Sequence, residues 1–382
     1  MKKYKVAFVT GSRADYGIVR NYLSKLNSDP EIDFSILTTG ALFASEFGLA
    51  VSIIENDGFR IDFKNKVDQK VSCLHDTVHI MATVLDNYSR FFAENKYDLL
   101  IILGDRYEIY SVSIAAAMHR IPILHIHGGE LTIANYDEFI RHSITKMSNF
   151  HITSTEEYRQ RVIQLGEHPS NVYYLGALGA ENSLTIDVNN VPYELKDIHN
   201  SFVVLFHPET LNSIPPLEQI KEVIKAVSNY IDKYNFIFIG SNADTHSDQI
   251  TETIKEFCSN NECAKFYANL HPDAYHYIVR HSIALIGNSS SGIIEVPSLG
   301  SYTINIGNRQ TGRVKSASIL DVPCEATAIV SAMNFAIVNK DEEITDTPYY
   351  KPNTAEEYYR VTKKIINQLS SISYKEFYNI QF

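Results

Sequence analysis

Short apolar segments rich in β-branched residues alternate with amphipathic segments along the chain. In the first half, KVAFVTGS, DFSILTTG, YDLLIILGD and IPILHIHGG have the pattern of strands, and YDLLIILGD is apolar on both faces, as a buried parallel strand is. Helical periodicity follows in YGIVRNYLSKL, YSVSIAAAMHR and EEYRQRVIQLG, and NVYYLG adds a short strand. Such a βαβ series predicts a doubly wound parallel sheet.

A second series of the same kind begins near residue 200. Its strands are expected at SFVVLFHP, NFIFIGS, AKFYAN, IALIGNSSS and YTINIG. The polar segment 181–200 separates the two series, so we expect one Rossmann-like domain over residues 1–180 and another over 181–353. Two doubly wound α/β domains facing each other across a cleft form a GT-B-like architecture, and ligands bind beyond the carboxyl ends of such strands.

The last helical pattern lies in residues 354–382. Its start, NTAEEYY, places Thr354 three residues before Glu357, which predicts a capping box. One face then carries the apolar side chains of Tyr358, Val361, Ile365 and Leu369. We expect this face to pack back onto the first domain.

The composition is that of a globular protein with two domains. A chain of 382 residues is long for one hydrophobic core, and 45% hydrophobic with 21% charged residues is ordinary for a folded protein. No apolar run approaches the roughly 18 residues that cross a bilayer, and MKKYKVAFVTGS lacks the features of a signal peptide. We therefore expect a cytoplasmic protein with no membrane partner. The net charge of −11 argues against nucleic acid as a partner.

Titratable side chains gather where two of the expected strands end. Asp105 and Arg106 follow LLIILG, and the segment HIHGGE places His127 and Glu130 beside a Gly-Gly pair. Gly-Asp-Arg after a strand also fits a turn in which Asp105 caps the next helix. Acidic and histidine side chains at adjacent strand ends, however, must lie apart, form ion pairs or take part in chemistry. Such a cluster can hold different protonation states, so that one group donates a proton while another accepts one.

Two further positions can add to this cluster. Asp137 and Arg141 are four residues apart on the helix after HIHGGE, so they share a face, either as a surface ion pair or turned toward the site. His207 ends the strand SFVVLF in the second domain. Across the expected cleft it would face the acids of the first domain.

The segment GNSSSGIIEVP combines a strand end, a Ser/Gly turn and a helix start. The backbone N–H groups of Ser290, Ser291 and Gly292 are expected to point at an anion, with the serine hydroxyls as further donors. Neither a Walker motif nor a nucleophile elbow fits the spacing, so a phosphate-binding turn is the better interpretation. Glu295, one turn into the helix, can accept from sugar hydroxyls.

Arginines lie in loops that suit a diphosphate. Arg13 is in the first strand–helix turn, and Arg309 and Arg313 are in GNRQTGR after the last expected strand. No metal is expected, because His75 and His79 have helical spacing but no third ligand at a typical distance. The turn GSRADYG lacks G-x-G-x-x-G, so no nicotinamide cofactor is expected.

Six segments in this order carry a resemblance to a known family. GDR, HIHGGE, YDEFIRHSITKMS, FHPET, GNSSSG and INIGNRQTGR closely resemble the hydrolysing UDP-N-acetylglucosamine 2-epimerases of bacterial sialic-acid synthesis. The resemblance runs from Val6 to about Pro323 and is weaker beyond. It implies a GT-B-like fold, a homodimer or homotetramer, and a UDP-sugar substrate. The implied reaction converts UDP-N-acetylglucosamine and water into N-acetylmannosamine and UDP, with no cofactor.

The resemblance also implies roles for individual residues. It implies catalytic roles for Asp105, Glu130, Asp137 and His207. It implies nucleotide binding by Arg13, Ser289, Ser290 and Glu295. The remaining substrate contacts that we expect are Arg106, His127, Arg141, Ser291, Gly292, Arg309 and Arg313. Many relatives have Glu where His127 stands, so either Glu130 or His127 itself supplies the acid or base of that position.

The implied chemistry needs two proton transfers. The proton on carbon-2 is a poor acid because no carbonyl is adjacent to it in the sugar ring. Its removal becomes feasible if the anomeric bond to UDP breaks at nearly the same time, which gives a glycal and UDP by anti elimination; water then adds from the face that yields the manno product. We expect Asp105, Glu130 and Asp137 to handle these transfers with help from His207, each well-placed group contributing roughly 10²- to 10⁴-fold.

Other functions fit the same segments. A hydrolysing 2-epimerase of a nucleotide-linked 2,4-diacetamido-trideoxy sugar, in a legionaminic-type pathway, would use almost the same motifs. A non-hydrolysing epimerase would return UDP-N-acetylmannosamine, and a GT-B glycosyltransferase would need an acceptor in place of water. From a different class, an inactive nucleotide-sugar sensor would bind without turnover, although a binding module has no need for the acids.

Overall fold

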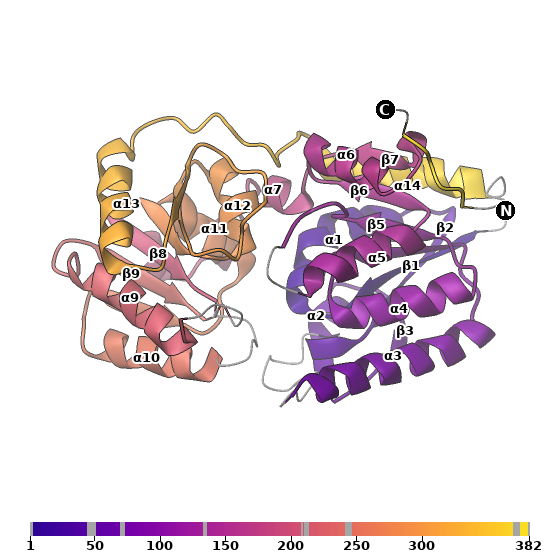
Figure 1. The fold of residues 1–382 in the computed structure, drawn as a ribbon, viewed down its shortest axis with the longest axis horizontal. Coiled ribbons are helices and arrows are strands. Elements are labelled where there is room, and N and C mark those ends of the chain that lie inside the picture. Colours follow the sequence, from indigo (N-terminus) through magenta and orange to yellow (C-terminus); the bar gives the residue numbers. More distant parts are fainter. Residues whose placement is uncertain are drawn as a thin grey trace. The chain divides into compact units, whose positions relative to one another are not determined.

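The computed structural model describes residues 3–43, 51–68, 73–132, 136–207, 209, 214–240, 247–369 and 375–380. The chain divides into two compact units (Figure 1). The first unit comprises Met1–Glu130, Tyr136–Leu178 and Lys351–Phe382, and the second comprises Leu131–Asn135 and Gly179–Tyr350. The breaks after Leu178 and Tyr350 lie close to residues 180 and 353, where the sequence places the boundaries, whereas the assignment of Leu131–Asn135 to the second unit was not expected.

The first unit contains a seven-stranded parallel sheet with the order β3-β2-β1-β4-β5-β6-β7. Its strands are β1 (Tyr4–Thr10), β2 (Ile32–Thr38), β3 (Ile61–Lys64), β4 (Leu99–Leu103), β5 (Ile123–Ile126), β6 (Phe150–Thr153) and β7 (Val172–Tyr174). Its helices are α1 (Arg13–Asn27), α2 (Val51–Asn56), α3 (Leu74–Glu94), α4 (Tyr107–Met118), α5 (Asp137–Met147), α6 (Glu156–Gln164) and α14 (Thr354–Gln368). Alternate residues of β1 enter two separate apolar cores, as in a sheet covered on both faces.

The second unit contains a six-stranded parallel sheet with the order β10-β9-β8-β11-β12-β13. Its strands are β8 (Ser201–Leu205), β9 (Asn235–Ile239), β10 (Ala264–Tyr267), β11 (Ala284–Gly287), β12 (Tyr302–Ile306) and β13 (Ile319–Val322). Its helices are α8 (Tyr193–Lys196), α9 (Pro216–Ser228), α10 (Ser247–Ser259), α11 (Pro272–Arg280), α12 (Ser290–Ile294) and α13 (Ala326–Asn339), and the short α7 (Leu178–Asn182) lies at the junction with the first unit.

Both sheets are doubly wound, as the sequence predicts. The chain order reverses beside the first strand of each sheet, between β1 and β4 in one and between β8 and β11 in the other. Two edge strands were not expected from the sequence, β3 (Ile61–Lys64) and β13 (Ile319–Val322). Both have only four residues and are partly exposed, so neither has the continuous apolar pattern of the central strands.

The predicted capping box at the start of α14 is wrong. Asn353 is the N-cap, in the left-handed conformation and without a side-chain cap bond. Thr354 is already inside the helix and fully buried. Its hydroxyl donates to the carbonyl of Lys351 at 2.7 Å and also approaches that of Leu175 at 3.3 Å. Burial of the threonine against these carbonyls removes it from a capping role.

The expected packing of α14 on the first domain is observed (Figure 1). Tyr358 and Ile365 of α14 are buried in the same core as residues of α1. The Tyr22 and Thr362 hydroxyls are 2.7 Å apart, and the rings of Tyr22 and Tyr358 meet edge to face. Among the described residues, no helix has the length and apolar character that crossing a bilayer requires.

Candidate active site

The ends of β4 and β5 hold the first group of candidate residues. The two strands are paired in parallel, and the N–H of Gly104 donates to the carbonyl of Ile126 at 3.1 Å. His125 reaches back from β5: its Nε2 is 2.9 Å from the carbonyl of Gly104, and its Nδ1 is 3.2 Å from the hydroxyl of Thr145. Burial lowers the pKa of His125 to about 3, so the ring is neutral and must carry its proton on Nε2. This histidine fixes the turn that presents Asp105.

Arg141 connects the ends of these two strands. Its side chain lies on α5 and is 3% exposed as a residue. The guanidinium forms an ion pair with Asp105 and donates to the carbonyl of Glu130 at 2.7 Å. Arg141 therefore faces the site and is not part of a surface ion pair. Asp105 is not a helix cap either, because Arg106 is the N-cap residue of α4.

His127 and Glu130 form a close pair after β5. His127 has φ +65°, a left-handed conformation that is uncommon for a residue other than glycine. Its Nδ1 is 3.0 Å from Glu130 Oε1, and the hydroxyl of Ser154 donates to the same oxygen at 3.0 Å. Gly129 must be glycine, since a Cβ there would lie 2.4 Å from the carbonyl oxygen of Tyr158. All three polar side chains are buried.

A second charged group lies where the chain order reverses between β1 and β4. The Arg106 guanidinium donates to the fully buried Glu108 carboxylate at 3.2 Å, and Glu108 is the main cause that raises the pKa of Arg106 above its ordinary value. Burial raises the pKa of Asp15 in the first turn of α1. Arg13 begins α1, but its side chain lies outside the described part of the structure. Asp137 is the first residue of α5.

In the second unit, Asn288 holds His207 at the carboxyl end of the sheet. The N–H of His207 donates to Asn288 Oδ1 at 2.8 Å, and Asn288 Nδ2 donates to the carbonyl of His207 at 2.8 Å. The asparagine side chain thus replaces a backbone partner for His207. Both residues are buried.

The loop after β12 is joined to the same asparagine. Arg309 and Gln310 side chains donate to the carbonyl of Asn288 at 2.9 and 2.8 Å. Glu209 accepts the backbone N–H groups of Asn308 and Arg309 at 2.8 and 2.9 Å. This network orders the segment that carries Arg309, while Arg313 lies further along it.

The Ser/Gly turn begins the short helix α12. Ser289 is the N-cap, and its side chain accepts the N–H of Ser291 at 3.4 Å, while the N–H of Gly292 donates to the carbonyl of Ser289 at 3.1 Å. Two of the three N–H groups expected to face an anion are therefore bonded within the turn. The Ser291 hydroxyl is 2.6 Å from that of Tyr275. Ser290 is the first helical residue.

Glu295 follows α12 and is held from two sides. Its Oε2 is 3.0 Å from His276 Nε2 on α11. A Cβ at Gly179 would lie 2.8 Å from Glu295 Oε1, so glycine at this position leaves room for the carboxylate. The carboxylate is thus oriented before any ligand arrives.

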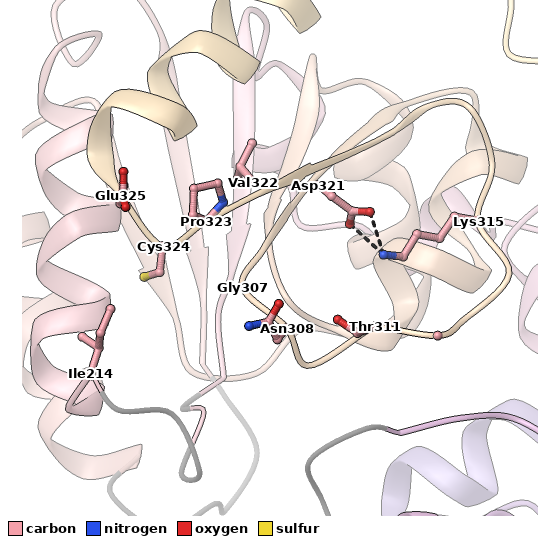
Figure 2. A pocket seen from close by; sticks show the side chains of 11 residues that line it. Ile214, Gly307, Asn308, Thr311, Lys315, Asp321, Val322, Pro323, Cys324 and Glu325 are labelled. Atoms are coloured by element: carbon pink, nitrogen blue, oxygen red, sulfur yellow. Dashed lines mark hydrogen bonds and ion pairs between the residues drawn. The ribbon is translucent and has the colours of Figure 1, made fainter.

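A cavity of about 490 Å³ opens beside the loop after β12 (Figure 2). Its wall includes Asn308 and Thr311, and Lys315 and Asp321 face each other there as an ion pair at 2.8 Å. None of the side chains that the sequence singles out lines this cavity. It lies beside the predicted site and is not the site itself.

A family model described as UDP-N-acetylglucosamine 2-epimerase matches residues 24–363. The chain belongs to this family. It is 46% identical to the polysialic acid biosynthesis protein P7 of Escherichia coli, over 98% of this chain and 97% of that protein. It is 35% identical to a Campylobacter jejuni protein named GDP/UDP-N,N'-diacetylbacillosamine 2-epimerase (hydrolyzing), over 84% and 85%.

The fold agrees with that of solved members of the family. The structure of the Neisseria meningitidis UDP-GlcNAc 2-epimerase bound to UDP-GlcNAc superposes with a TM-score of 0.78 at 16% identity, covering 94% of this chain and all of that chain. At this identity the likeness concerns the fold alone. The expected GT-B-like fold class with two Rossmann-like domains is confirmed.

The structure brings together most residues that the sequence singles out, within each unit separately. Asp105, His127, Glu130 and Arg141 meet in the first unit. In the second unit, His207 and Arg309 share Asn288. Sequence reasoning missed the residues that hold these groups in place: Ser154, Asn288, Tyr275, His276 and Gln310. Asn288 stands within GNSSSG and could have been found there, whereas Tyr275 and His276 lie in no motif.

Proposed function

We propose that this member of the family is a hydrolysing epimerase, which converts UDP-N-acetylglucosamine and water into N-acetylmannosamine and UDP for sialic-acid synthesis. The observation that carries the proposal is the buried cluster at the ends of β4 and β5, where Arg141 joins Asp105 to the segment of Glu130 and His127. The names of the E. coli and C. jejuni relatives support the pathway and the hydrolytic reaction.

The first unit supplies groups for two proton transfers. One group must take the proton from carbon-2 while the bond from carbon-1 to UDP breaks, and another must return a proton to carbon-2 when water adds to carbon-1. Asp105, Asp137 and the pair formed by His127 and Glu130 are the titratable groups at this edge of the sheet that we assign to these steps. Their different partners allow them to hold different protonation states.

The second unit supplies groups for the nucleotide. We assign the diphosphate to the Ser289–Gly292 turn with Arg309 and Arg313, and a sugar hydroxyl to the carboxylate of Glu295, which His276 orients. His207 lies at the same end of this sheet and is assigned an assisting role. Charge neutralisation of the leaving UDP by arginines would stabilise the transition state. The proposed reaction needs no metal or redox cofactor.

We further propose a cytoplasmic homodimer or homotetramer. Apolar side chains are exposed on neighbouring helices of the first unit, namely Val78 on α3, Met118 on α4 and Phe139 on α5. Exposed apolar side chains on adjoining elements are typical of interaction surfaces. Sedimentation at micromolar concentration would show a single species larger than 43.3 kDa.

A second candidate substrate is a nucleotide-linked 2,4-diacetamido-trideoxy sugar. The similarity to the C. jejuni enzyme named for diacetylbacillosamine favours it. The reaction would be the same, and only the groups around carbon-4 and carbon-6 of the sugar would differ.

Proton NMR in D₂O tests the proposal. The purified protein is incubated with UDP-N-acetylglucosamine and no added metal or nicotinamide. The expected products are free UDP and N-acetylmannosamine with deuterium at carbon-2. UDP-N-acetylmannosamine without free UDP would show a non-hydrolysing epimerase, and no reaction with this sugar but turnover of the diacetamido sugar would assign the second substrate. Tight UDP binding with no turnover of either sugar would indicate a sensor.

A further inference from the structure

The side chains of His127 and Glu130 form a dyad whose two members have different environments. Glu130 Oε1 accepts two hydrogen bonds, from the Ser154 hydroxyl and from His127 Nδ1, each at 3.0 Å. His127 Nε2 is buried and has no hydrogen-bond partner among the described residues. The residue as a whole is 8% exposed. Burying a polar nitrogen without a partner is costly, so an unsatisfied one in a native site calls for a ligand or a reacting group.

The tautomer of the ring follows from its partner. A carboxylate accepts hydrogen bonds, so the proton of a neutral imidazole that faces Glu130 lies on Nδ1. Nε2 then carries the lone pair and can accept a proton. His125 is the reverse case two residues earlier, because its Nε2 must donate to the carbonyl of Gly104. The two histidines of the HIHGGE segment therefore have opposite tautomers and different roles.

The backbone of His127 supports a specific role for this side chain. The residue keeps a left-handed φ of +65° between β5 and two glycines, where a third glycine would cost less strain. The N–H of His127 is fixed to the carbonyl of Ile152 at 2.9 Å. Residues held in such sparsely populated conformations cluster at functional sites.

The neighbouring acids are weaker proton acceptors than this nitrogen. Asp105 is engaged with Arg141, whose positive charge stabilises the ionised carboxylate and makes it a poorer base. Glu130 is engaged with two donors, which has the same effect. The other titratable groups around the dyad are His125 on β5, Glu138 and His142 on α5, and His151 on β6.

We propose that His127 is a catalytic residue of this enzyme, whose Nε2 takes the proton from carbon-2 of the sugar, and that Glu130 is the positioning residue that orients its ring. In this step the carbon-2 to hydrogen electrons form the double bond to carbon-1, and the electrons of the bond from carbon-1 to oxygen leave with UDP. The proton remains on the imidazole. The assignment rests on the proposed function, and of the two alternatives that the sequence leaves open at this position, Glu130 or His127, it selects His127.

Four variants test the dyad in the turnover assay. His127→Gln should lower kcat by about 10²- to 10⁴-fold with KM changed by only a few-fold. His127→Glu should restore part of kcat and move the acidic limb of the pH–rate profile to lower pH, because a carboxylic acid replaces the imidazolium. Glu130→Gln should lower kcat and also move the acidic limb to lower pH, because the imidazole loses the charge that favours its protonated form. The control His75→Gln, an exposed position on α3, should match the unchanged protein.

The results separate a wrong dyad from a wrong function. UDP affinity by calorimetry, similar in all variants, shows that each one folds. If the unchanged protein turns over neither sugar, the proposed function fails. If it turns over but His127→Gln keeps kcat within three-fold, or Glu130→Gln leaves the acidic limb in place, the dyad assignment is overturned.

A spectrum independent of turnover tests the same geometry. The protein is labelled with ¹⁵N-histidine, and the signals of His127 are assigned by their loss in His127→Gln. Two-bond ¹⁵N–¹H correlation in alkaline buffer should then show His127 with Nδ1 protonated and Nε2 unprotonated. A ring protonated on Nε2 would overturn the proposal whatever the substrate is.

Discussion

The six strands of the second sheet have the same order as the first six of the seven-stranded sheet, but the two sheets carry different side chains at the corresponding strand ends. After β4 and β5 the first unit has Asp105, His127, Glu130 and the buried Arg141. After the corresponding strands β11 and β12, the second unit has Asn288, the serine turn that begins at Ser289, and the amide side chain of Gln310. Arg309 carries a positive charge there. In such sheets the topology fixes the edge at which ligands bind. On the proposed function, the loops then decide that the edge of the first unit transfers protons and that the edge of the second binds the nucleotide.

The two edges are also held together in a similar way. In the first unit, His125 from β5 donates to the carbonyl of Gly104 at the end of β4. In the second, Arg309 and Gln310 from the loop after β12 donate to the carbonyl of Asn288 at the end of β11. In each case a side chain from the later strand, or from the loop that follows it, donates to the carbonyl of the residue that follows the earlier strand, which fixes the turn there.

The largest effect is expected at Arg141. This residue holds the charged edge, by which we mean Asp105, His127 and Glu130 after β4 and β5. Arg141→Met leaves Asp105 and the carbonyl of Glu130 without their buried cation. We expect kcat to fall more than about 100-fold and stability to fall by about 3 kcal/mol. Steady-state kinetics and urea unfolding measure the two effects, with the exposed Arg90→Met on α3 as the control. Near-normal kcat would show that the charged edge does not act on the sugar.

A smaller effect is expected at Asn288 in the second unit. Asn288→Ala removes both side-chain hydrogen bonds to the backbone of His207. We expect UDP to bind about 10-fold more weakly, whereas Gln310→Ala, which removes one bond to a carbonyl, should weaken it only a few-fold. Calorimetry with UDP gives both values. If the two variants lose the same amount of UDP affinity, or lose none, the hydrogen bonds of Asn288 do not contribute to nucleotide binding.

The buried histidines of the first unit are expected to make the free energy of unfolding depend on pH. The pKa of His125 is lowered to about 3 by burial, so below the unfolded value near 6.5 the unfolded chain binds a proton that the folded state does not. Stability is thus fully present above pH 6.5 and falls by about 1.4 kcal/mol per pH unit as the pH drops toward 3. His151, also in the first unit, has its pKa lowered by burial in the same direction.

Urea unfolding at pH 7 and pH 5.5 measures this slope. His125→Gln should give a shallower pH dependence than the unchanged protein, whatever its stability at pH 7. An unchanged slope would mean that His125 is protonated in the folded state, which contradicts its role as a neutral donor to Gly104.

The smallest effect is expected at Ser154. Ser154→Ala removes one neutral donor from Glu130 but leaves His127 in place. We expect kcat to change by no more than a few-fold, since a neutral hydrogen bond contributes only about 1 kcal/mol. A loss as large as that of Arg141→Met would show that the serine, not the histidine, is the partner that matters.

The sequence predicts the central parts of the fold well and its edges less well. The apolar runs of β1, β4 and β11 are continuous because these strands are buried on both faces, and each was expected. The edge strands β3 and β13 were missed because half-exposed short strands have mixed composition. The capping box failed at Thr354 because sequence spacing does not show that the residue is buried.

For the site, the sequence predicts the positions but not the partners. Asp105, Glu130 and His207 were expected at strand ends, since an apolar run ends shortly before each of them. The ion pair of Arg141 with Asp105 could not be read from spacing, because it joins α5 to the end of β4. The same holds for Asn288 with His207, which are 81 residues apart.

The central claim is that the bond from carbon-1 to oxygen breaks and water adds to the sugar. The most direct measurement is turnover of UDP-N-acetylglucosamine in H₂¹⁸O, followed by ³¹P NMR of the UDP released. We predict UDP without ¹⁸O, because the single oxygen between carbon-1 and the β-phosphorus stays with the leaving UDP and the oxygen of water goes to carbon-1. Incorporation of ¹⁸O into the β-phosphate would mean attack of water on phosphorus, and it would contradict the elimination and the roles assigned to the acidic edge.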